Sequence, residues 1–120
     1  MILADTNAWV AHIRRGDGRL VGLLEQNRVV TCDVVLGELM LGAGLPPALH
    51  RDLALLPRVP CRTVSQTRGF VERHRAIFRV SGVGWADAEI IAAAADAGAL
   101  LYSADDAVRA VWRKLGYRLA

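Results

Sequence analysis

Short aliphatic runs alternate along this chain with longer segments whose apolar residues recur at helical spacing. Five runs are predicted to be strands, the last of them marginal: residues 2–4, 29–32, 59–64, 99–102 and 117–119. Seven segments are predicted to be helices: residues 7–14, 18–25, 34–41, 47–55, 66–79, 85–97 and 104–115. This alternation favours an α/β fold in which a parallel β-sheet of about five strands lies sandwiched between helices.

The size and composition of the chain are typical of one globular domain. With 120 residues, 53% of them hydrophobic and 22% charged, a single domain over residues 1–120 is expected. Apolar runs fall short of the ~20 residues that span a bilayer, and the N-terminus has no signal-peptide pattern. Cys32 and Cys61 fit core positions better than a disulfide. We therefore expect a cytoplasmic protein without a membrane partner.

The basic residues suggest an anionic partner but do not prove one. The net charge is +3, and all but one of the 15 basic residues are arginine, whose fork binds phosphates in bidentate fashion. Arginine-rich usage is also typical of GC-rich genomes. Arg14, Arg15 and Arg19 flank the end of the first predicted helix and are the best candidates for phosphate contacts, with ordinary solvated arginines as the alternative.

Four of the 12 acidic residues occupy positions that surface roles explain poorly. Asp5 ends the first predicted strand, and ligands of parallel sheets gather at the carboxyl ends of strands; a turn aspartate is the alternative. Glu38 shares a face of its predicted helix with Val34 and Leu41. An unpaired carboxylate on an apolar face is costly to desolvate, which favours a functional role for Glu38 over a surface one.

The other two acids follow the same logic later in the chain. Asp87 lies on the apolar stripe of its predicted helix, although a first-turn acid that stabilises the helix dipole is the alternative. Ser103 follows the predicted strand 99–102 and is expected to cap the next helix, with Asp106 as its capping-box partner. Asp105 would then be free to point across the ends of the strands.

These four carboxylates are expected to converge at one edge of the sheet, because neighbouring strands lie only ~4.8 Å apart. Two such charges about 5 Å apart repel by roughly 3 kcal/mol at an effective dielectric constant of 20. The cluster must therefore protonate, spread apart or bind cations. Hard oxygen ligands without converging Cys or His suit Mg²⁺ or Mn²⁺ rather than zinc.

Four short motifs give the chain a resemblance to a known family: "ADTN" around Asp5, "GEL" around Glu38, "ADAEIIAAA" with Asp87 and "YSAD" ending at Asp105. In this order and at these intervals they resemble the PIN domain family, and specifically the VapC-type toxins of toxin–antitoxin pairs. The resemblance implies a PIN-like three-layer α/β/α fold and a Mg²⁺- or Mn²⁺-dependent endoribonuclease. It also implies the toxin component of a type II pair, inhibited by a cognate antitoxin.

The family's metal ligands carry over by resemblance to Asp5, Glu38, Asp87 and Asp105. Asp5 would be the central ligand, and Glu38 would bind metal, directly or through water, or act as general base, while RNA is cleaved by metal-activated water. The accompanying hydroxyls match Thr6 and Ser103, which would orient the carboxylates. Relatives often place an acid and an aromatic residue shortly after the fourth acid, where this chain has Ala107 and Val108. The local role of Asp106 is thereby left open.

Protein partners are expected on apolar helices. The segments "LVGLL" (residues 20–24) and "LALL" (residues 53–56) are candidate surfaces for a homodimer or for the antitoxin, with core packing as the alternative.

Two other functions stay open at this stage. One is a catalytically inactive PIN-like RNA-binding module, which would keep the fold without the reaction. The other is a receiver-type phospho-acceptor domain, which needs an acidic pair after the first strand and a lysine at the end of the last. Here Thr6 and Asn7 follow Asp5, and the only lysine, Lys114, lies in a predicted helix, so the sequence favours the nuclease.

Overall fold

A computed structural model describes residues 1–42 and 44–120, and in this part of the chain it places three strands in one parallel sheet. β1 (Ile2–Ala4) is the central strand, and β2 (Val29–Val30) and β3 (Leu100–Tyr102) pair with it on either side. Ile2 lies opposite Val29 on β2 and opposite Leu100 on β3. The predicted α/β fold with a parallel sheet between helices is therefore confirmed.

The prediction of about five strands is wrong for the described residues. The predicted strand 59–64 is absent, and the one bridge near it, of Thr31 with Arg58, lies one residue before it. The predicted strand 117–119 is reduced to a single parallel bridge of Leu101 with Leu119. Pro57 and Pro60 flank the first of these bridges, and proline has no N–H to donate to a ladder. Only Arg58 and Val59, which lie between the two prolines, can therefore donate to a ladder here.

The second bridge is short because the chain before it is engaged with a helix. Tyr117 donates its backbone N–H to the carbonyl of Trp112 and stacks on the Trp112 ring, with centroids 4.6 Å apart. The backbone is thus committed to the helix until Leu119, and Ala120 then donates to the carbonyl of Leu101 at 2.9 Å.

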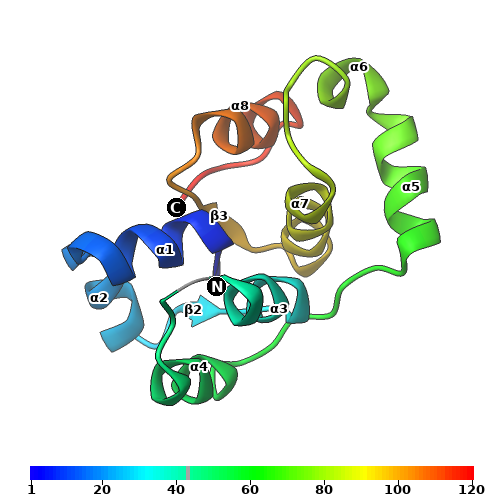
Figure 1. The fold of residues 1–120 in the computed structure, drawn as a ribbon. Coiled ribbons are helices and arrows are strands. Elements are labelled where there is room, and N and C mark those ends of the chain that lie inside the picture. The colour runs from blue at the N-terminus through cyan, green and yellow to red at the C-terminus, as the bar shows by residue number, and fades with distance from the viewer. Residues whose placement is uncertain (43) are drawn as a thin grey trace.

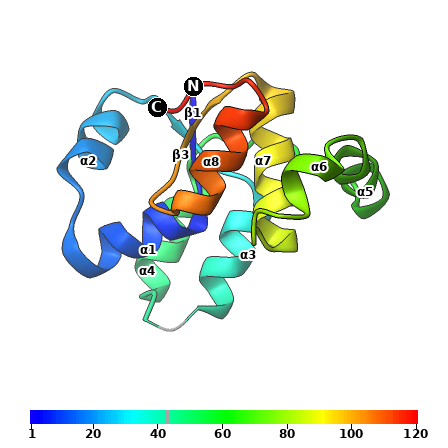
Figure 2. The same cartoon turned by 90° about the horizontal axis from the view of Figure 1, so that it is seen from above.

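Eight helices in the described part of the chain surround the sheet: α1 (Thr6–Arg15), α2 (Gly18–Glu25), α3 (Asp33–Leu41), α4 (Pro47–Ala54), α5 (Val64–Arg73), α6 (Arg75–Phe78), α7 (Trp85–Ala97) and α8 (Asp106–Lys114). α1 and α2 lie on one side of the strands and α7 on the other, with α5 and α6 beyond α7 at the periphery (Figures 1 and 2). The starts of α1, α7 and α8 lie together at the lower end of the strands in Figure 2.

The helix predicted over residues 66–79 is two helices, because the backbone leaves helical geometry at His74, with φ −112° and ψ 28°. In one continuous helix Phe70 and Phe78 would lie about 12 Å apart along the axis. The break instead brings their rings to 5.8 Å in an edge-to-face contact, and both side chains are buried.

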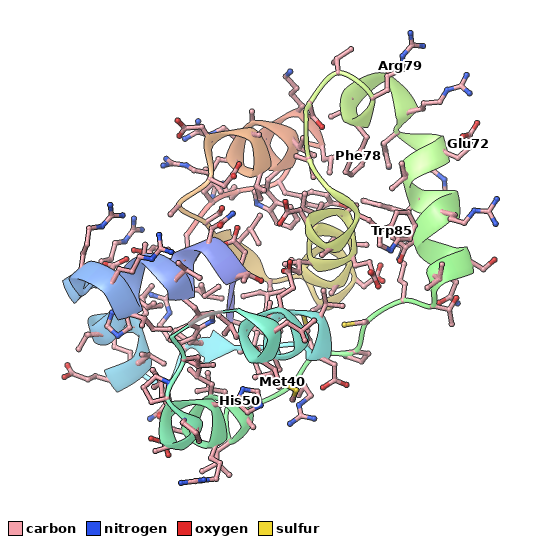
Figure 3. All side chains as sticks on the ribbon, in the orientation of Figure 1. Met40, His50, Glu72, Phe78, Arg79 and Trp85 are labelled. Carbon is pink, nitrogen blue, oxygen red and sulfur yellow. The ribbon has the colours of Figure 1, made fainter. Side chains whose placement is uncertain are left out.

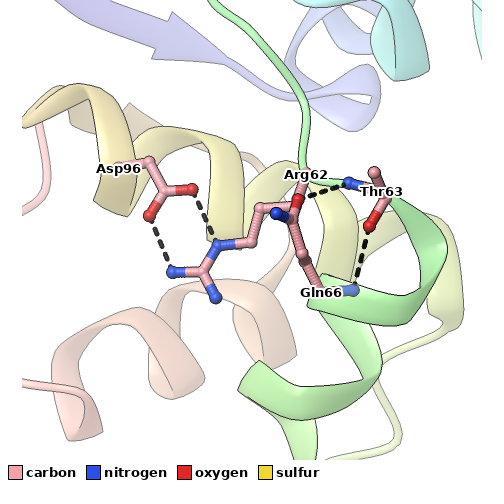
Figure 4. A network of polar contacts seen from close by, with 4 residues as sticks. All are labelled: Arg62, Thr63, Gln66 and Asp96. Atoms are coloured by element: carbon pink, nitrogen blue, oxygen red, sulfur yellow. Dashed lines mark hydrogen bonds and ion pairs between the residues drawn. The ribbon is translucent and has the colours of Figure 1, made fainter.

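α5 also begins two residues earlier than predicted, at a capping box. The Thr63 hydroxyl accepts from the backbone N–H of Gln66 at 3.1 Å, and the Gln66 side chain accepts from the N–H of Thr63 at 2.9 Å. Figure 4 shows this box beside a second contact, in which Arg62 donates two hydrogen bonds of 2.7 Å to Asp96. The ion pair ties the segment before α5 to the last turn of α7.

α7 is the central helix of the molecule. It packs against α3, α5, α8 and β3, and its residues from Ile90 to Ala94 are all buried. Gly98 ends the helix in the left-handed conformation, with φ 65°, and turns the chain into β3. At its start, Trp85 extends toward α5 and is 43% exposed (Figure 3).

The two cysteines have free thiols, Cys32 buried and Cys61 half-buried, as expected. Among the helices described, none has both the length and the apolar character needed to cross a bilayer.

Candidate functional site

Asp5 lies at the carboxyl end of the central strand and is only 1% exposed. It is also the N-cap of α1: its Oδ1 accepts from the N–H of Ala8 at 2.8 Å, and its Oδ2 accepts from the hydroxyl of Ser103. Burial raises the pKa of Asp5 to about 6, and the charges of Asp87 and Asp105 add to this rise, while the two hydrogen bonds oppose it. The role as helix cap thus accounts for the position of Oδ1 only, and it does not explain why a carboxylate that is costly to ionise is buried here.

Asp105 follows β3 and corrects the predicted cap of the last helix. Asp105, not Ser103, is the N-cap of α8, and its Oδ1 accepts from the N–H of Val108 at 3.0 Å. The Ser103 hydroxyl instead donates to Asp5 and accepts from the N–H of Asp105 at 3.0 Å. The Ser103 hydroxyl therefore bonds to Asp5 at the end of the neighbouring strand, and Asp105 caps α8 in its place. Asp106 begins α8, is exposed and has no capping-box role.

Asp87 lies in the first turn of α7 and is half-buried. Its pKa is raised by burial first, and then by the charges of Glu38 and Asp105, against a backbone hydrogen bond from Gly84 that lowers it. A surface acid that only stabilised the helix dipole would not be desolvated and surrounded by like charges in this way.

Glu38 lies in the middle of α3 and is half-buried. Its Oε1 accepts a hydrogen bond from the hydroxyl of Thr6, at the start of α1. Leu36 and Leu39 on the same helix are buried, so the carboxylate emerges from an apolar helix toward the end of β1.

The four predicted acids thus form one group, here called the acid cluster: Asp5, Glu38, Asp87 and Asp105. Asp5 is repelled by Asp87 and Asp105, and Asp87 is repelled by Glu38 and Asp105, so each member is electrostatically linked to another. The three ion pairs among the described residues involve none of these carboxylates. The cluster consequently concentrates negative charge that the described side chains leave unbalanced.

Oxygen ligands of this kind fit a hard divalent cation by their chemistry. Within residues 1–42 and 44–120, however, no three His, Cys, Asp or Glu side chains lie close enough together to hold a metal ion as they stand. Sharing one ion would require the carboxylates of the acid cluster to move closer together. One oxygen of Asp5 and one of Asp105 are held in place by helix caps, while Asp105 Oδ2 receives only a long contact of 3.4 Å from Asn7.

Thr6 and Ser103, the predicted supporting hydroxyls, both donate to carboxylates of the acid cluster. Asn7 was missed as a supporting residue, although the polar triplet "DTN" after the first strand was a signal for it. Its amide donates to Asp105 across 98 positions of sequence, a contact that spacing alone cannot predict.

The three predicted phosphate-binding arginines are exposed but differ in what surrounds them. Arg14 lines a cavity of about 310 Å³ together with Thr6 and Glu38, and with apolar side chains such as Val10. Arg19 lines another cavity, of about 230 Å³, that also reaches Ser103. The two arginines thus line different cavities, each of which shares a residue with the site: Glu38 in one case and Ser103 in the other.

Arg15 is the last residue of α1 and points to solvent. Among the described residues it forms no ion pair, as is typical of an ordinary surface arginine.

Three comparisons relate this chain to known proteins. The family model described as "PIN domain" matches residues 2–114. The chain is 34% identical over 122 residues to proteins named Ribonuclease VapC32 from two strains of Mycobacterium tuberculosis, covering 100% of this chain and 97% of each relative. The solved structure of FitAcB from Neisseria gonorrhoeae has a similar fold, with a TM-score of 0.55 at 20% sequence identity over 92% of this chain and 93% of that one.

Proposed function

Because this chain belongs to the PIN domain family, as a relative of its VapC-type members, we propose that it is a metal-dependent endoribonuclease and the toxin of a type II toxin–antitoxin pair. The observation that carries the proposal is the acid cluster at the carboxyl end of the central strand. Its charges are unbalanced by the ion pairs of the described residues, and burial raises the pKa of Asp5 to about 6. The family-model match and the relatives named above are a PIN domain and ribonucleases, so they do not support the receiver-type alternative.

We assign metal binding to Asp5, Asp87 and Asp105, with Mg²⁺ or Mn²⁺ as the ion suited to oxygen ligands. When bound, such an ion would lower the pKa of a coordinated water and stabilise charge on the phosphate. The bonds from Ala8 and Ser103 orient both oxygens of Asp5, so the other carboxylates would have to approach Asp5 for the acid cluster to share one ion.

Glu38 serves in this scheme as a further ligand, directly or through water, or as the general base. The Thr6 hydroxyl holds Oε1, and no other hydrogen bond among the described residues engages the carboxylate. Oε2 is thus left to accept the proton of the attacking water. The water oxygen would bond to phosphorus while the bond from phosphorus to the leaving ribose oxygen breaks. The ribose oxygen would take a proton from solvent and Glu38 would return its proton to solvent, so that one phosphodiester becomes a phosphate end and a hydroxyl end.

The protein partner of this toxin is an antitoxin that covers the site, and apolar surface on α3 and α4 offers it a place to dock. Met40 and Leu41 are 66% and 90% exposed at the end of α3, and Leu55 is 83% exposed just after α4. The "LVGLL" segment supports this less, because Leu20 and Leu23 are buried, and in "LALL" Leu53 is buried as well, which leaves Leu55 as its exposed leucine. We also propose a homodimer as the working unit and the cytoplasm, where the RNA substrate lies, as its location.

Cleavage of a mixture of cellular RNA by the purified protein tests the activity. We expect cleavage with Mg²⁺ or Mn²⁺, none with excess chelator, and none by Asp5→Asn under any condition. Asp106→Asn is the matched control, because Asp106 carries the same charge in an exposed position beside Asp105.

Wild-type protein that binds RNA but leaves it uncut with both ions would establish the inactive RNA-binding module instead. Cleavage by Asp5→Asn at the wild-type rate would remove Asp5 from the metal ligands. Co-expression with the neighbouring small open reading frame, followed by pull-down, tests the antitoxin, and light scattering after gel filtration tests the dimer.

A further inference from the structure

A cavity of about 230 Å³ lies directly beside the acid cluster, on the side of β3 and α8. Ser103, whose hydroxyl binds Asp5, forms part of its wall, so the cavity and the cluster share a residue. Arg19 from α2 and Arg109 from α8 also line it, together with Asp17 and Tyr102. We refer to this cavity as the arginine pocket.

The two guanidinium groups of the arginine pocket are available to a ligand. Among the described residues, the ion pairs of arginine are those of Arg58, Arg62 and Arg75, and neither Arg19 nor Arg109 takes part in one. Arg109 lines the pocket and is half-buried.

Asp17 is the one acidic side chain among the described residues that line the pocket, where Leu119 and Ala120 also lie, and its carboxylate is already hydrogen-bonded by the protein. Asp17 caps α2, accepting from the N–H groups of Arg19 and Leu20, and it accepts a 2.6 Å bond from the hydroxyl of Tyr102. That hydroxyl bond is the main reason that the pKa of Asp17 is lowered. A carboxylate with these donors competes weakly for the arginines.

Tyr102 also positions one of the arginines. The guanidinium carbon of Arg19 lies 5.5 Å from the centroid of the Tyr102 ring, a cation–π arrangement that holds the planar fork at the wall of the pocket. An arginine arranged in advance loses less side-chain entropy when it binds an anion.

We propose that the arginine pocket binds the phosphodiester next to the scissile one in the RNA strand, with Arg19 and Arg109 as its ligands. This inference rests on the proposed nuclease function, since it is the substrate strand that would pass from the acid cluster into the pocket. The acid cluster repels the RNA backbone, and the arginine pocket, which adjoins the cluster through Ser103, provides opposite charge from two arginines that form no ion pair among the described residues. Both can donate bidentate hydrogen bonds to phosphate oxygens, which a single lysine cannot.

The binding test uses the full chain and a fluorescent single-stranded RNA of mixed sequence, about 12 nucleotides long, in chelator so that the RNA stays intact. We expect Arg19→Ala and Arg109→Ala each to weaken binding about tenfold. Each should also reduce the slope of log affinity against log salt by about 0.7, the value for one lost contact to a single strand. Arg109→Lys should keep the slope and recover part of the affinity.

Arg113→Ala is the matched control, because Arg113 lies one turn further along α8 and is exposed. It should bind RNA as the wild type does. The proposal would be overturned if Arg109→Ala bound RNA with the same affinity as Arg113→Ala, whether or not both bound more weakly than the wild type. Thermal unfolding of each variant would separate lost binding from lost folding.

A second measurement locates the phosphate. In an oligonucleotide that the wild type cuts at one position, a single uncharged methylphosphonate linkage beside that position should slow cleavage about tenfold. The same linkage should make little further difference to Arg19→Ala/Arg109→Ala. A penalty of equal size in both proteins would show that the pocket does not hold this phosphate.

The two proposals fail separately. A wild type that cuts no RNA, but whose binding still depends on Arg19 and Arg109, would refute the nuclease and keep the pocket as an RNA site. A wild type that cuts RNA while both variants behave as Arg113→Ala would do the reverse.

Discussion

At the level of single residues, the acids that matter could be selected from the sequence, but their bonds could not. Asp5 was recognised because it follows a strand, and Glu38 because it lies on an apolar face. Asp105 was selected by assigning the helix cap to Ser103 and Asp106, and that assignment is wrong. That Asp105 rather than Ser103 caps α8 depends on the Ser103 hydroxyl reaching Asp5, a contact across 98 positions. Local capping rules cannot anticipate such competition, because only the folded sheet brings the two residues together.

Ionisation of the buried Asp5 destabilises the folded protein, so the free energy of unfolding depends on pH. Its pKa in the folded state is about 6, against an ordinary value of 3.8, so the folded state binds more protons between these values. The free energy of unfolding therefore falls as pH rises through this window, and stays low above it. Asp5→Asn removes the titration while Asn can still cap α1. We expect the free energy of unfolding of Asp5→Asn to exceed that of the wild type by about 2 kcal/mol at pH 7.5, and by much less at pH 4.5.

Denaturant unfolding of both proteins at the two pH values, in chelator, measures this difference. Asp106→Asn, an exposed change of the same chemistry, should show no such pH dependence. A gain for Asp5→Asn that is equal at both pH values would mean that ionisation of Asp5 is not its source.

Ser103 positions Asp5, and its removal should be visible in the titration of that acid. The hydroxyl bond lowers the pKa of Asp5 against the larger effect of burial, so Ser103→Ala should raise this pKa further above 6. We expect the acidic limb of the pH–rate profile to move to higher pH in the same direction. Ser103→Thr should restore the profile, and an NMR titration of the Asp5 carboxyl group would contradict the argument if the pKa did not rise.

At the level of elements, apolar periodicity predicted most helices, while two prolines account for the failure to predict the sheet near Val59. The core run of α7 and the three paired strands follow from apolar spacing. The segment around Val59 is β-branched enough to suggest a strand, yet Pro57 and Pro60 leave it a single bridge. The break at His74 follows from the contact of Phe70 with Phe78, which is tertiary and has no sequence signal.

The capping box that starts α5 gives an element-level prediction. Thr63→Ala removes the acceptor for the N–H of Gln66 and should reduce the free energy of unfolding by about 1 kcal/mol. Ser65→Ala is the control, because Ser65 lies exposed in the same turn and is not the cap. Thermal or urea unfolding measures both, and an equal loss in the two variants would show that the box contributes nothing specific.

At the level of the whole molecule, the fold brings together groups that are individually costly. Three helix starts and one helix middle place carboxylates around the end of β1, and the arginine pocket adjoins them. The net charge of +3 therefore conceals a local separation of negative and positive groups. A cation between the carboxylates would reduce their repulsion of each other and of an RNA phosphate. Because only the folded chain brings the carboxylates together, binding of the ion should be linked to folding of the entire chain.

This linkage gives a prediction for the intact protein. Ligands that bind only the folded state stabilise it, by about 2.7 kcal/mol at a concentration one hundred times the dissociation constant. Mn²⁺ or Mg²⁺ should thus raise the melting temperature of the wild type and of Asp106→Asn, but not that of Asp5→Asn. The increase should grow as pH rises through about 6, because a protonated Asp5 cannot serve as a ligand. Na⁺ at matched ionic strength separates site binding from general screening, and an equal increase in Asp5→Asn would place the ion elsewhere on the molecule.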